Sequence, residues 1–524
     1  MIDIDQVGAV GYEKLQVQMN GLGTIVAMPQ WYINFNLAKL LKYGKTTEGK
    51  SLQDVQLSIG KGSMWLSGKI DKMWTEVFVS GSTHKVKFIL RFAGGSMDYY
   101  DLSQNPPEPQ RADIAGLQFG FDVDLNRADV LDNASLPEDV KKRVSELLSY
   151  LGPGAFTVKQ LFMDFENATL SQYDPSVTIF PLKFPDSAVA SFPQYLITYL
   201  KGLSSAGGNI LGYAIKVDNP GGAKDPVATF PPTDLQFATN RYTPSQNPRP
   251  DEWKSDLDTI NFQMMTGGQP FPTNLPVWFG NFVDPADETT GWYGTISMAH
   301  RLFVQSFLLS RLAPLVTQYW RLKDNAESLD IGHDPATGTL AYNGLGGSWN
   351  SGVQSSHSHK SGYDADYNFV FDVKLSITPG SNRIVIQRNT DFDIKINGFT
   401  VRYSVPLTIT VELQGVQDGK LVVATTTQTK QPDPDTLYGD PYGWLITDTK
   451  GDYSIWSAVI KIMDKVIENA VNAAMPEALL PNIVKEITEN LNLSPFVFPG
   501  GAELFMANPV FNNEGDLMLG LQYK

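Results

Sequence analysis

The stretch LTITVELQGVQDGKLVVAT, residues 407–425, decides the fold class of this chain. From Leu407 to Leu413, apolar and polar residues alternate, which is typical of an antiparallel strand with one buried face and one solvated face. The polar run from Gln417 to Lys420 predicts a tight hairpin turn, after which the chain returns as a second strand. The sequence therefore predicts antiparallel β-structure here.

The same alternation recurs near both ends of the chain. Strands are predicted at Val55–Ile59, Val86–Phe92, Leu117–Leu125, Val158–Leu170, Phe369–Ile377 and Leu517–Leu521. Amphipathic helices are predicted at Ser135–Leu151 and Ile455–Ala474, because their apolar residues are spaced by three and four. A further helix is predicted to be capped by Ser297 and to end or bend at Pro314.

The order of strands, helix and strand appears twice, which favours two similar lobes. The predicted fold class is α+β, with highly curved antiparallel β-sheets wrapped around long amphipathic helices in an elongated, two-lobed molecule. The predicted domains are an N-terminal lobe over residues 1–217, a loop-rich β connection over 218–295 and a C-terminal lobe over 296–524. The connection is rich in Pro, Gly, Asn and Asp, which are residues of turns.

The most regular helix, from Ile455 onward, indicates where a ligand could bind. If a sheet rolls around such a helix without closing on it, the remaining space is an elongated apolar groove suited to acyl chains. The candidate lining residues of this groove are Val459, Ile462, Met463, Val466, Ile467, Ala470 and Val471. An ordinary filled core uses the same residue types, so the pattern leaves both interpretations open.

Composition excludes several classes of protein. The 524 residues include 41 Lys and Arg against 56 Asp and Glu, a net charge of −15, which argues against a nucleic-acid partner. The chain has no cysteine, so disulfides, Cys-ligated metal sites and thiolate nucleophiles are excluded. The sequence shows no secretory signal and no apolar run that could span a bilayer. The expected location is the cytoplasm, or outside the cell after release without a classical signal peptide.

One motif formally matches a phosphate-binding loop. Gly44-Lys-Thr-Thr-Glu-Gly-Lys-Ser51 fits the pattern G-x-x-x-x-G-K-[ST]. A true site has a strand before the loop and a helix after it, so that N–H groups at the helix start face the phosphates. Here a helix is predicted before the loop and a strand after it. We interpret the motif as a charged turn and predict no nucleotide hydrolysis.

Other chemical motifs are weak. His357 and His359 lie close in sequence to Asp364 and Asp366, but a solvated polar loop explains them better than a metal site. The role of the surrounding segment, 324–362, stays open. The serine hydrolase elbow G-x-S-x-G is missing, and the carboxylate pairs Asp122/Asp124 and Asp391/Asp393 occupy polar strand positions. The sequence therefore predicts no catalytic site, no metal site and no cofactor.

Three patches carry a resemblance to a known family. They are GTISMAHRLFVQSFLL at 294–309, the helix from Ser454, and FVFPGGAELFMANPVF at 496–511 with the following Asp516–Leu519. Together they resemble the clostridial forty-seven-kilodalton protein and the related OrfX proteins, which are encoded beside botulinum-type neurotoxins. That family belongs to the tubular lipid-binding (TULIP) superfamily, in which a curved antiparallel sheet wraps a long helix. The resemblance thus implies TULIP-like lobes.

The resemblance also implies a non-enzymatic role. The first hypothesis is binding of lipid or another hydrophobic ligand in an apolar groove, in an accessory protein of a toxin or biosynthetic cluster. The second is a component of a protein complex, with filled lobes and a partner protein on an outer surface. The third is an unusual enzyme that uses the apolar groove as its active site.

Overall fold

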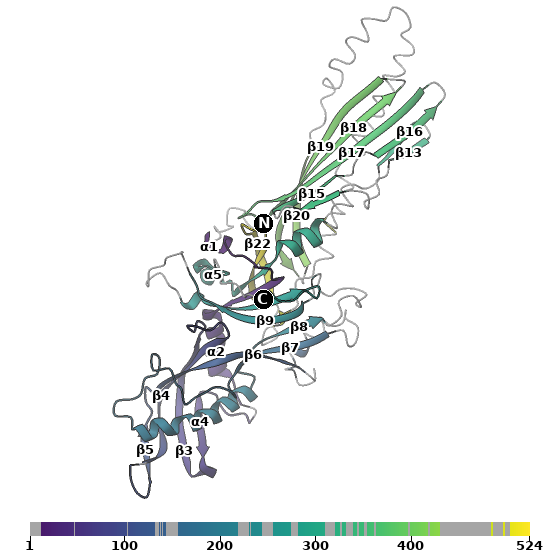
Figure 1. Ribbon diagram of the computed structural model, residues 1–524. Helices are drawn as coiled ribbons and strands as arrows, with labels where there is room; N and C mark the ends of the chain where they lie inside the picture. The colour runs from purple at the N-terminus through teal and green to yellow at the C-terminus, as the bar shows by residue number, and fades with distance from the viewer. Residues whose placement is uncertain are drawn as a thin grey trace, which may run out of the picture. The chain divides into compact units, whose positions relative to one another are not determined.

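The computed structural model (Figure 1) describes most of the chain. The described residues are 12–46, 48–101, 103–130, 136, 138, 140–142, 156–217, 230, 232–243, 255–273, 281–309, 320–324, 327–331, 339–342, 345–350, 354–360, 363–396, 399–417, 420–429, 484–485, 496–497 and 504–523. They form two compact units. Unit 1 comprises Met1–Met298, Asn492–Ala507 and Met518–Lys524, and unit 2 comprises Ala299–Leu491 and Asn508–Leu517.

Unit 1 contains a curled antiparallel sheet. Its strands lie in the order β2 (Asp54–Ile59), β3 (Met64–Glu76), β4 (Lys85–Asp101), β6 (Gln118–Asp129), β7 (Phe156–Asp164), β8 (Ile210–Val217) and β21 (Phe496–Val497), and β5 (Glu108–Asp113) pairs with β4. The register of β3 against β4 shifts beside Ile70, and irregularities of this kind increase the twist of a sheet. Gly95 has a φ of +135°, and a Cβ there would lie 2.3 Å from the carbonyl oxygen of Ser67, so glycine is required at this position.

Two helices cover the curled sheet. α2 (Gln30–Tyr43) packs on β3, and α4 (Asp186–Ser205) packs on β4 and β2. α4 was not predicted from the sequence, although its buried residues are spaced mainly by three and four. They are Ala188, Phe192, Tyr195, Leu196, Tyr199, Leu200 and Leu203. This spacing gives α4 the continuous apolar face that it buries.

A second sheet of unit 1 is buried on both faces. Its strands lie in the order β9 (Pro232–Asn240), β10 (Thr259–Thr266), β1 (Thr24–Pro29), β11 (Gly294–Met298) and β23 (Leu517–Tyr523). Every residue of β1, β10 and β11 is buried. The short helix α1 (Tyr12–Leu15) precedes the first strand, and three more lie between strands in sequence: η2 (Gly60–Gly62), η5 (Ser255–Leu257) and α5 (Pro285–Thr290).

Unit 2 is built on long antiparallel strands. The order is β14 (Thr339–Tyr342), β15 (Gly346–Asn350), β17 (Tyr363–Ile377), β18 (Arg383–Ile396) and β19 (Phe399–Gln417), with β16 (Gln354–Lys360) paired to β17 and β20 (Lys420–Thr429) paired to β19. β12 (Trp320–Asp324) and β13 (Glu327–Ile331) form a separate hairpin. β22 (Leu504–Phe511) contributes residues to both units.

The structure confirms the predicted fold class, α+β with antiparallel sheets, and most of the predicted strands. Gln417 pairs with Lys420, as the hairpin prediction requires. The helix predicted after Ser297 starts later, because Ser297 and Met298 belong to β11 and pair with β1; the π-helix η6 then runs over Arg301–Leu309. Of the helix predicted at 135–151, residues 138 and 140–142 are helical. The helix predicted at 455–474 lies outside the described residues.

Candidate functional site

One face of the unit 2 sheet is apolar over three adjacent strands. The side chains form three cross-strand rows: Ile377–Ile384–Val411, Leu375–Ile386–Ile409 and Val373–Arg388–Leu407. None of these nine side chains is more than 6% exposed. Neighbouring strands lie about 4.8 Å apart, and rows on one face about 6.7 Å apart along the strands. The rows therefore make a broad aliphatic surface that the chain itself covers in this structure.

Arg388 is the one charged side chain in these three rows. It lies between Val373 and Leu407 and is 5% exposed. Burial lowers the pKa of its guanidinium to about 10, so the group remains a cation at neutral pH. A guanidinium in apolar surroundings is stabilised by an anion, and its planar donors match a carboxylate or phosphate. The aliphatic surface thus ends at a group suited to an acid.

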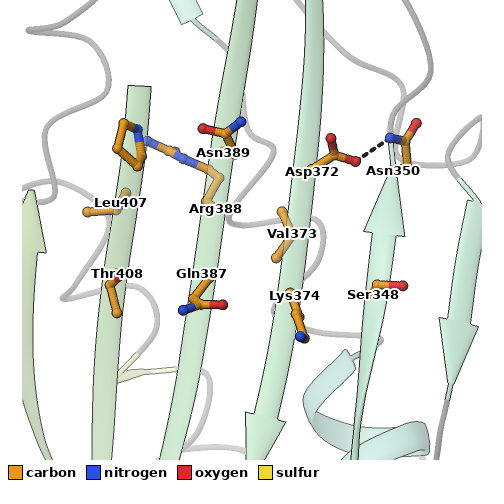
Figure 2. Close-up of a pocket in the computed structure, with 11 residues that line it drawn as sticks. Ser348, Asn350, Asp372, Val373, Lys374, Gln387, Arg388, Asn389, Leu407 and Thr408 are labelled. Atoms are coloured by element: carbon orange, nitrogen blue, oxygen red, sulfur yellow. Dashed lines mark hydrogen bonds between the residues drawn. The ribbon is translucent and has the colours of Figure 1, made fainter. Parts of the chain in front are cut away.

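The same strands border an open pocket of about 470 Å³ (Figure 2). Its lining includes two rows of the more polar face, Asn350–Asp372–Asn389–Pro406 and Ser348–Lys374–Gln387–Thr408, and also the row Val373–Arg388–Leu407. Asn350 donates a hydrogen bond through Nδ2 to Asp372 (Figure 2). The pocket combines the carboxylate of Asp372, the ammonium group of Lys374, amides and hydroxyls with the guanidinium of Arg388 and the apolar side chains of Val373, Pro406 and Leu407, so its lining is polar and apolar together.

In unit 1, helix α4 fills the equivalent apolar face with aromatic rings. The ring of Phe192 lies 5.9 Å from that of Phe92 and 5.0 Å from that of Phe119. Tyr195 and Tyr199 donate hydrogen bonds from their hydroxyls to the carbonyl oxygens of Asp98 (2.9 Å) and Leu52 (3.0 Å). Burial raises the pKa of Tyr195 to about 12 and also raises that of Tyr199. These hydroxyls stay protonated and anchor the helix to the strands.

The loop that resembles a phosphate-binding motif lies where the sequence predicts, after helix α2 and before strand β2. Its backbone N–H groups bond within the loop: Thr46 to the carbonyl oxygen of Lys50 (2.8 Å) and Gly49 to that of Thr46 (2.8 Å). The N–H of Lys50 donates to the hydroxyl of Thr46 (3.2 Å). These donors are used inside the turn, so the interpretation as a charged turn is confirmed.

The segment with His357 and His359 is strand β16 and not the polar loop that the sequence predicts. Strand pairing places His357 opposite Asp366 and His359 opposite Asp364, and among the side chains that the structure describes there is no group of three or more metal-binding residues. His300 has a structural role instead. Its Nδ1 lies 3.0 Å from Oδ1 of Asp516, and its backbone N–H donates to the same oxygen at 2.8 Å. Asp516 thereby anchors the start of η6.

The predicted groove residues Val459, Ile462, Met463, Val466, Ile467, Ala470 and Val471 lie outside the described residues, so their role stays a prediction. Sequence reasoning did not single out Arg388. The signal that could have found it is a charged residue at an inward position of β18, in phase with Ile384 and Ile386.

No family model and no curated protein matches the chain. Solved structures do. P47 from Clostridium botulinum A2 is 11% identical, with a TM-score of 0.47 over 98% of this chain and 99% of P47. P47 of C. botulinum E1 is 10% identical, with a TM-score of 0.48 over 96% and 100%. A lipopolysaccharide binding protein is 8% identical, with a TM-score of 0.33 over 96% and 99%.

The chain is thus similar over nearly its whole length to P47, the protein whose family the sequence resembles. Membership of that family and of the TULIP superfamily stays a prediction. In the described ranges, no helix is both long and apolar enough to span a membrane.

Proposed function

We propose that this chain binds a hydrophobic ligand non-enzymatically, and that the ligand is an amphiphile with an apolar chain and one acidic group. The observation that carries the proposal is the aliphatic face of β17, β18 and β19, which ends at the buried cation Arg388. An accessory role in a toxin or biosynthetic cluster belongs to the same proposal.

The energetics favour such a ligand. Each methylene group moved from water into apolar surroundings contributes about 0.8 kcal/mol. Rows of Ile, Leu and Val supply those surroundings, and their contacts with an apolar chain do not require a particular orientation. A carboxylate or phosphate at Arg388 adds charge-assisted hydrogen bonds to the guanidinium. The apolar rows thus supply affinity, and Arg388 supplies preference for an acid.

Native mass spectrometry of gently purified protein, with lipid extraction of the same sample, is the first test. We expect a co-purifying amphiphile at near-stoichiometric amount. A clean mass of the chain alone, together with failure to take up added dodecanoate or phospholipid, would contradict ligand binding.

The preference for an acid is tested with dodecanoate and dodecanol in parallel titrations. Arg388→Met keeps a long side chain and removes the charge, so we expect dodecanoate to bind at least about tenfold more weakly, because each 1.4 kcal/mol is tenfold in affinity. Dodecanol binding should change little. Lys374→Met, one position away in register on the polar face, is the matched control and should leave both affinities unchanged. Equal effects of the two substitutions would contradict the role of Arg388.

The solvent face of α2 favours a second function, the docking of an acidic partner protein. Phe35 and Tyr43 are 45% and 69% exposed, with the ammonium groups of Lys39 and Lys42 lying 4.3 and 5.0 Å from their ring centres. Exposed aromatic side chains are enriched at protein interfaces, and the lysine ammonium groups complement an acidic surface. Salt-sensitive binding of an acidic polypeptide such as poly-glutamate, lost in Lys39→Glu/Lys42→Glu, would support this function. Absence of such binding at low salt would contradict it.

A further inference from the structure

The second sheet of unit 1 has two unlike faces, although both are buried. One face carries large apolar side chains, such as the row Phe237–Phe262–Val26–Ile296. The other carries small and polar side chains in the rows Ala238–Asn261–Ala27–Thr295 and Gln236–Gln263–Ile25–Ser297. We call these two rows the polar seam. Asn261, Gln263, Thr295 and Ser297 are all 0% exposed.

Four polar atoms of the seam have no hydrogen-bond partner within the described part of the chain. They are Nδ2 of Asn261, Nε2 of Gln263, Oγ1 of Thr295 and Oγ of Ser297. The amide oxygens, in contrast, are used. Asn261 Oδ1 accepts from the hydroxyl of Thr259 at 2.8 Å, and Gln263 Oε1 accepts from Nε2 of Gln236 at 3.0 Å. The seam therefore presents amide donors and hydroxyls, but no charge.

The side chains of the seam are smallest at one point. β10 and β11 lie on either side of β1, so their backbones are roughly 9.6 Å apart, twice the strand spacing. Between Asn261 and Thr295 the intervening side chain is only the methyl group of Ala27. In the neighbouring row the larger Ile25 stands between Gln263 and Ser297. A single oxygen can bond to two groups that lie roughly 5.7 Å apart, the sum of two hydrogen-bond lengths.

We propose that the polar seam binds a neutral oxygen-bearing molecule over Ala27, where its oxygen accepts a hydrogen bond from Asn261 and bonds to the hydroxyl of Thr295. The oxygen belongs either to ordered water or to an uncharged organic ligand. Buried polar groups in native proteins are nearly always hydrogen-bonded, and a cluster of several unpaired ones needs a partner. Because the seam carries no charge, the partner is neutral. This site lies in unit 1 and is independent of the ligand proposed for unit 2.

A matched pair of isosteric substitutions tests the site. Thr239 lies on the apolar face of the same sheet, beside Ile260, and its hydroxyl is also buried without a partner in the described residues. A lone hydroxyl among apolar groups does not hold a water, which needs two to four polar partners. Thr239→Val should therefore leave the thermal midpoint of the full chain unchanged or raise it, since an unpaired buried polar atom is removed.

Thr295→Val makes the same change on the seam and should have the opposite effect. Here the substitution removes a bond to the bound oxygen, so we expect calorimetry to show a midpoint lower by about 2 °C. Ser297→Ala should act in the same direction. If Thr295→Val and Thr239→Val shift the midpoint equally, in either direction, the proposal is overturned.

Native mass spectrometry distinguishes the two sources of oxygen. Extra mass on the wild-type chain that is lost in Thr295→Val identifies an organic ligand. A lower midpoint for Thr295→Val without any such mass identifies water. Both outcomes support the site.

Discussion

The curled sheet of unit 1 and the long sheet of unit 2 both bury one apolar face, but with different kinds of side chain. In unit 1, the rings of Phe192, Phe92 and Phe119 interlock, and tyrosine hydroxyls fix α4 to the strands. In unit 2, the rows are aliphatic and end at Arg388. Ring pairs prefer particular geometries, whereas aliphatic surfaces accept many apolar partners.

This difference between aromatic and aliphatic side chains indicates which of the two apolar faces is the better candidate for a ligand site. A face closed by rings from its own helix resembles a finished core, and exchanging that helix for a ligand would break fixed contacts. The unit 2 face is as deeply buried, so our proposal that an amphiphile binds there rests on its aliphatic rows and its buried cation. Three substitutions or conditions test this contrast, from the largest expected effect to the smallest.

Phe192→Ala should have the largest effect. The ring is 1% exposed and packs against two other rings, so its removal should leave a cavity and lower the free energy of unfolding of unit 1 by about 4 kcal/mol. Denaturant unfolding of the full chain measures this loss. Ile197→Ala, at a 45% exposed position on the same helix, is the control and should change stability little. A loss below about 1 kcal/mol for Phe192→Ala would show that the face is not tightly filled.

Ile409→Ala should cost less, about 2 to 3 kcal/mol, and its cost should depend on ligand. Ile409 is fully buried in the central row of the unit 2 face. If dodecanoate binds along this face, it should fill part of the new space and recover part of the stability. The same ligand should recover nothing in Phe192→Ala. Equal recovery in both variants would break the contrast between the two faces.

A change of pH should have the smallest of the three effects, and it should lower the stability of unit 1 but not that of unit 2. Burial raises the pKa of Asp258 in unit 1 to about 7, despite the Tyr242 N–H bond to its carboxylate and the charge of Arg241; Asp256 and Glu76 add to the rise. The neutral carboxyl is favoured in the folded state, so its contribution to stability is complete below about pH 4 and is lost as pH rises through 7.

Between pH 6 and 8 the expected loss is about 1.4 kcal/mol, measured by calorimetry on the transition of unit 1. Arg388, with a pKa near 10, keeps its charge over this range, so it adds no pH dependence to unit 2. Asp258→Asn should remove the slope. A slope that persists in this variant would assign it to other groups.

Most strands were predictable because one of their faces is buried and the other is exposed to solvent. In the strand segments that start at Leu407 and Ile384, apolar and polar residues alternate in sequence, and their side chains alternate between the two faces of the sheet. The hairpin at Gln417–Lys420 has the expected turn residues. The turn after α2 was also predictable, because a phosphate-binding loop requires the reverse order of strand and helix.

Other elements could not be read from periodicity alone. β10 alternates polar and apolar residues, which predicts a wet face, yet Asn261 and Gln263 are fully buried because the whole sheet is covered on both sides. α4 escaped prediction because Pro193 and several aromatic residues interrupt the usual helix composition. Arg388 resembles a surface residue in sequence, and only the register with Val373 and Leu407 places it on the buried face.

The division of the chain between the two units also has a consequence for biosynthesis. Unit 1 needs residues 492–507 and 518–524, and unit 2 needs residues 508–517, although most of unit 1 precedes Met298. β11 is an interior strand only when β23 has joined it, as the bond from the Tyr293 N–H to the Leu521 carbonyl oxygen shows at 2.7 Å. During translation, β11 is therefore an open sheet edge while about two hundred further residues are made, an interval of at least roughly ten seconds at typical elongation rates. A chaperone that shields this edge until β23 emerges would act on a defined and predictable target.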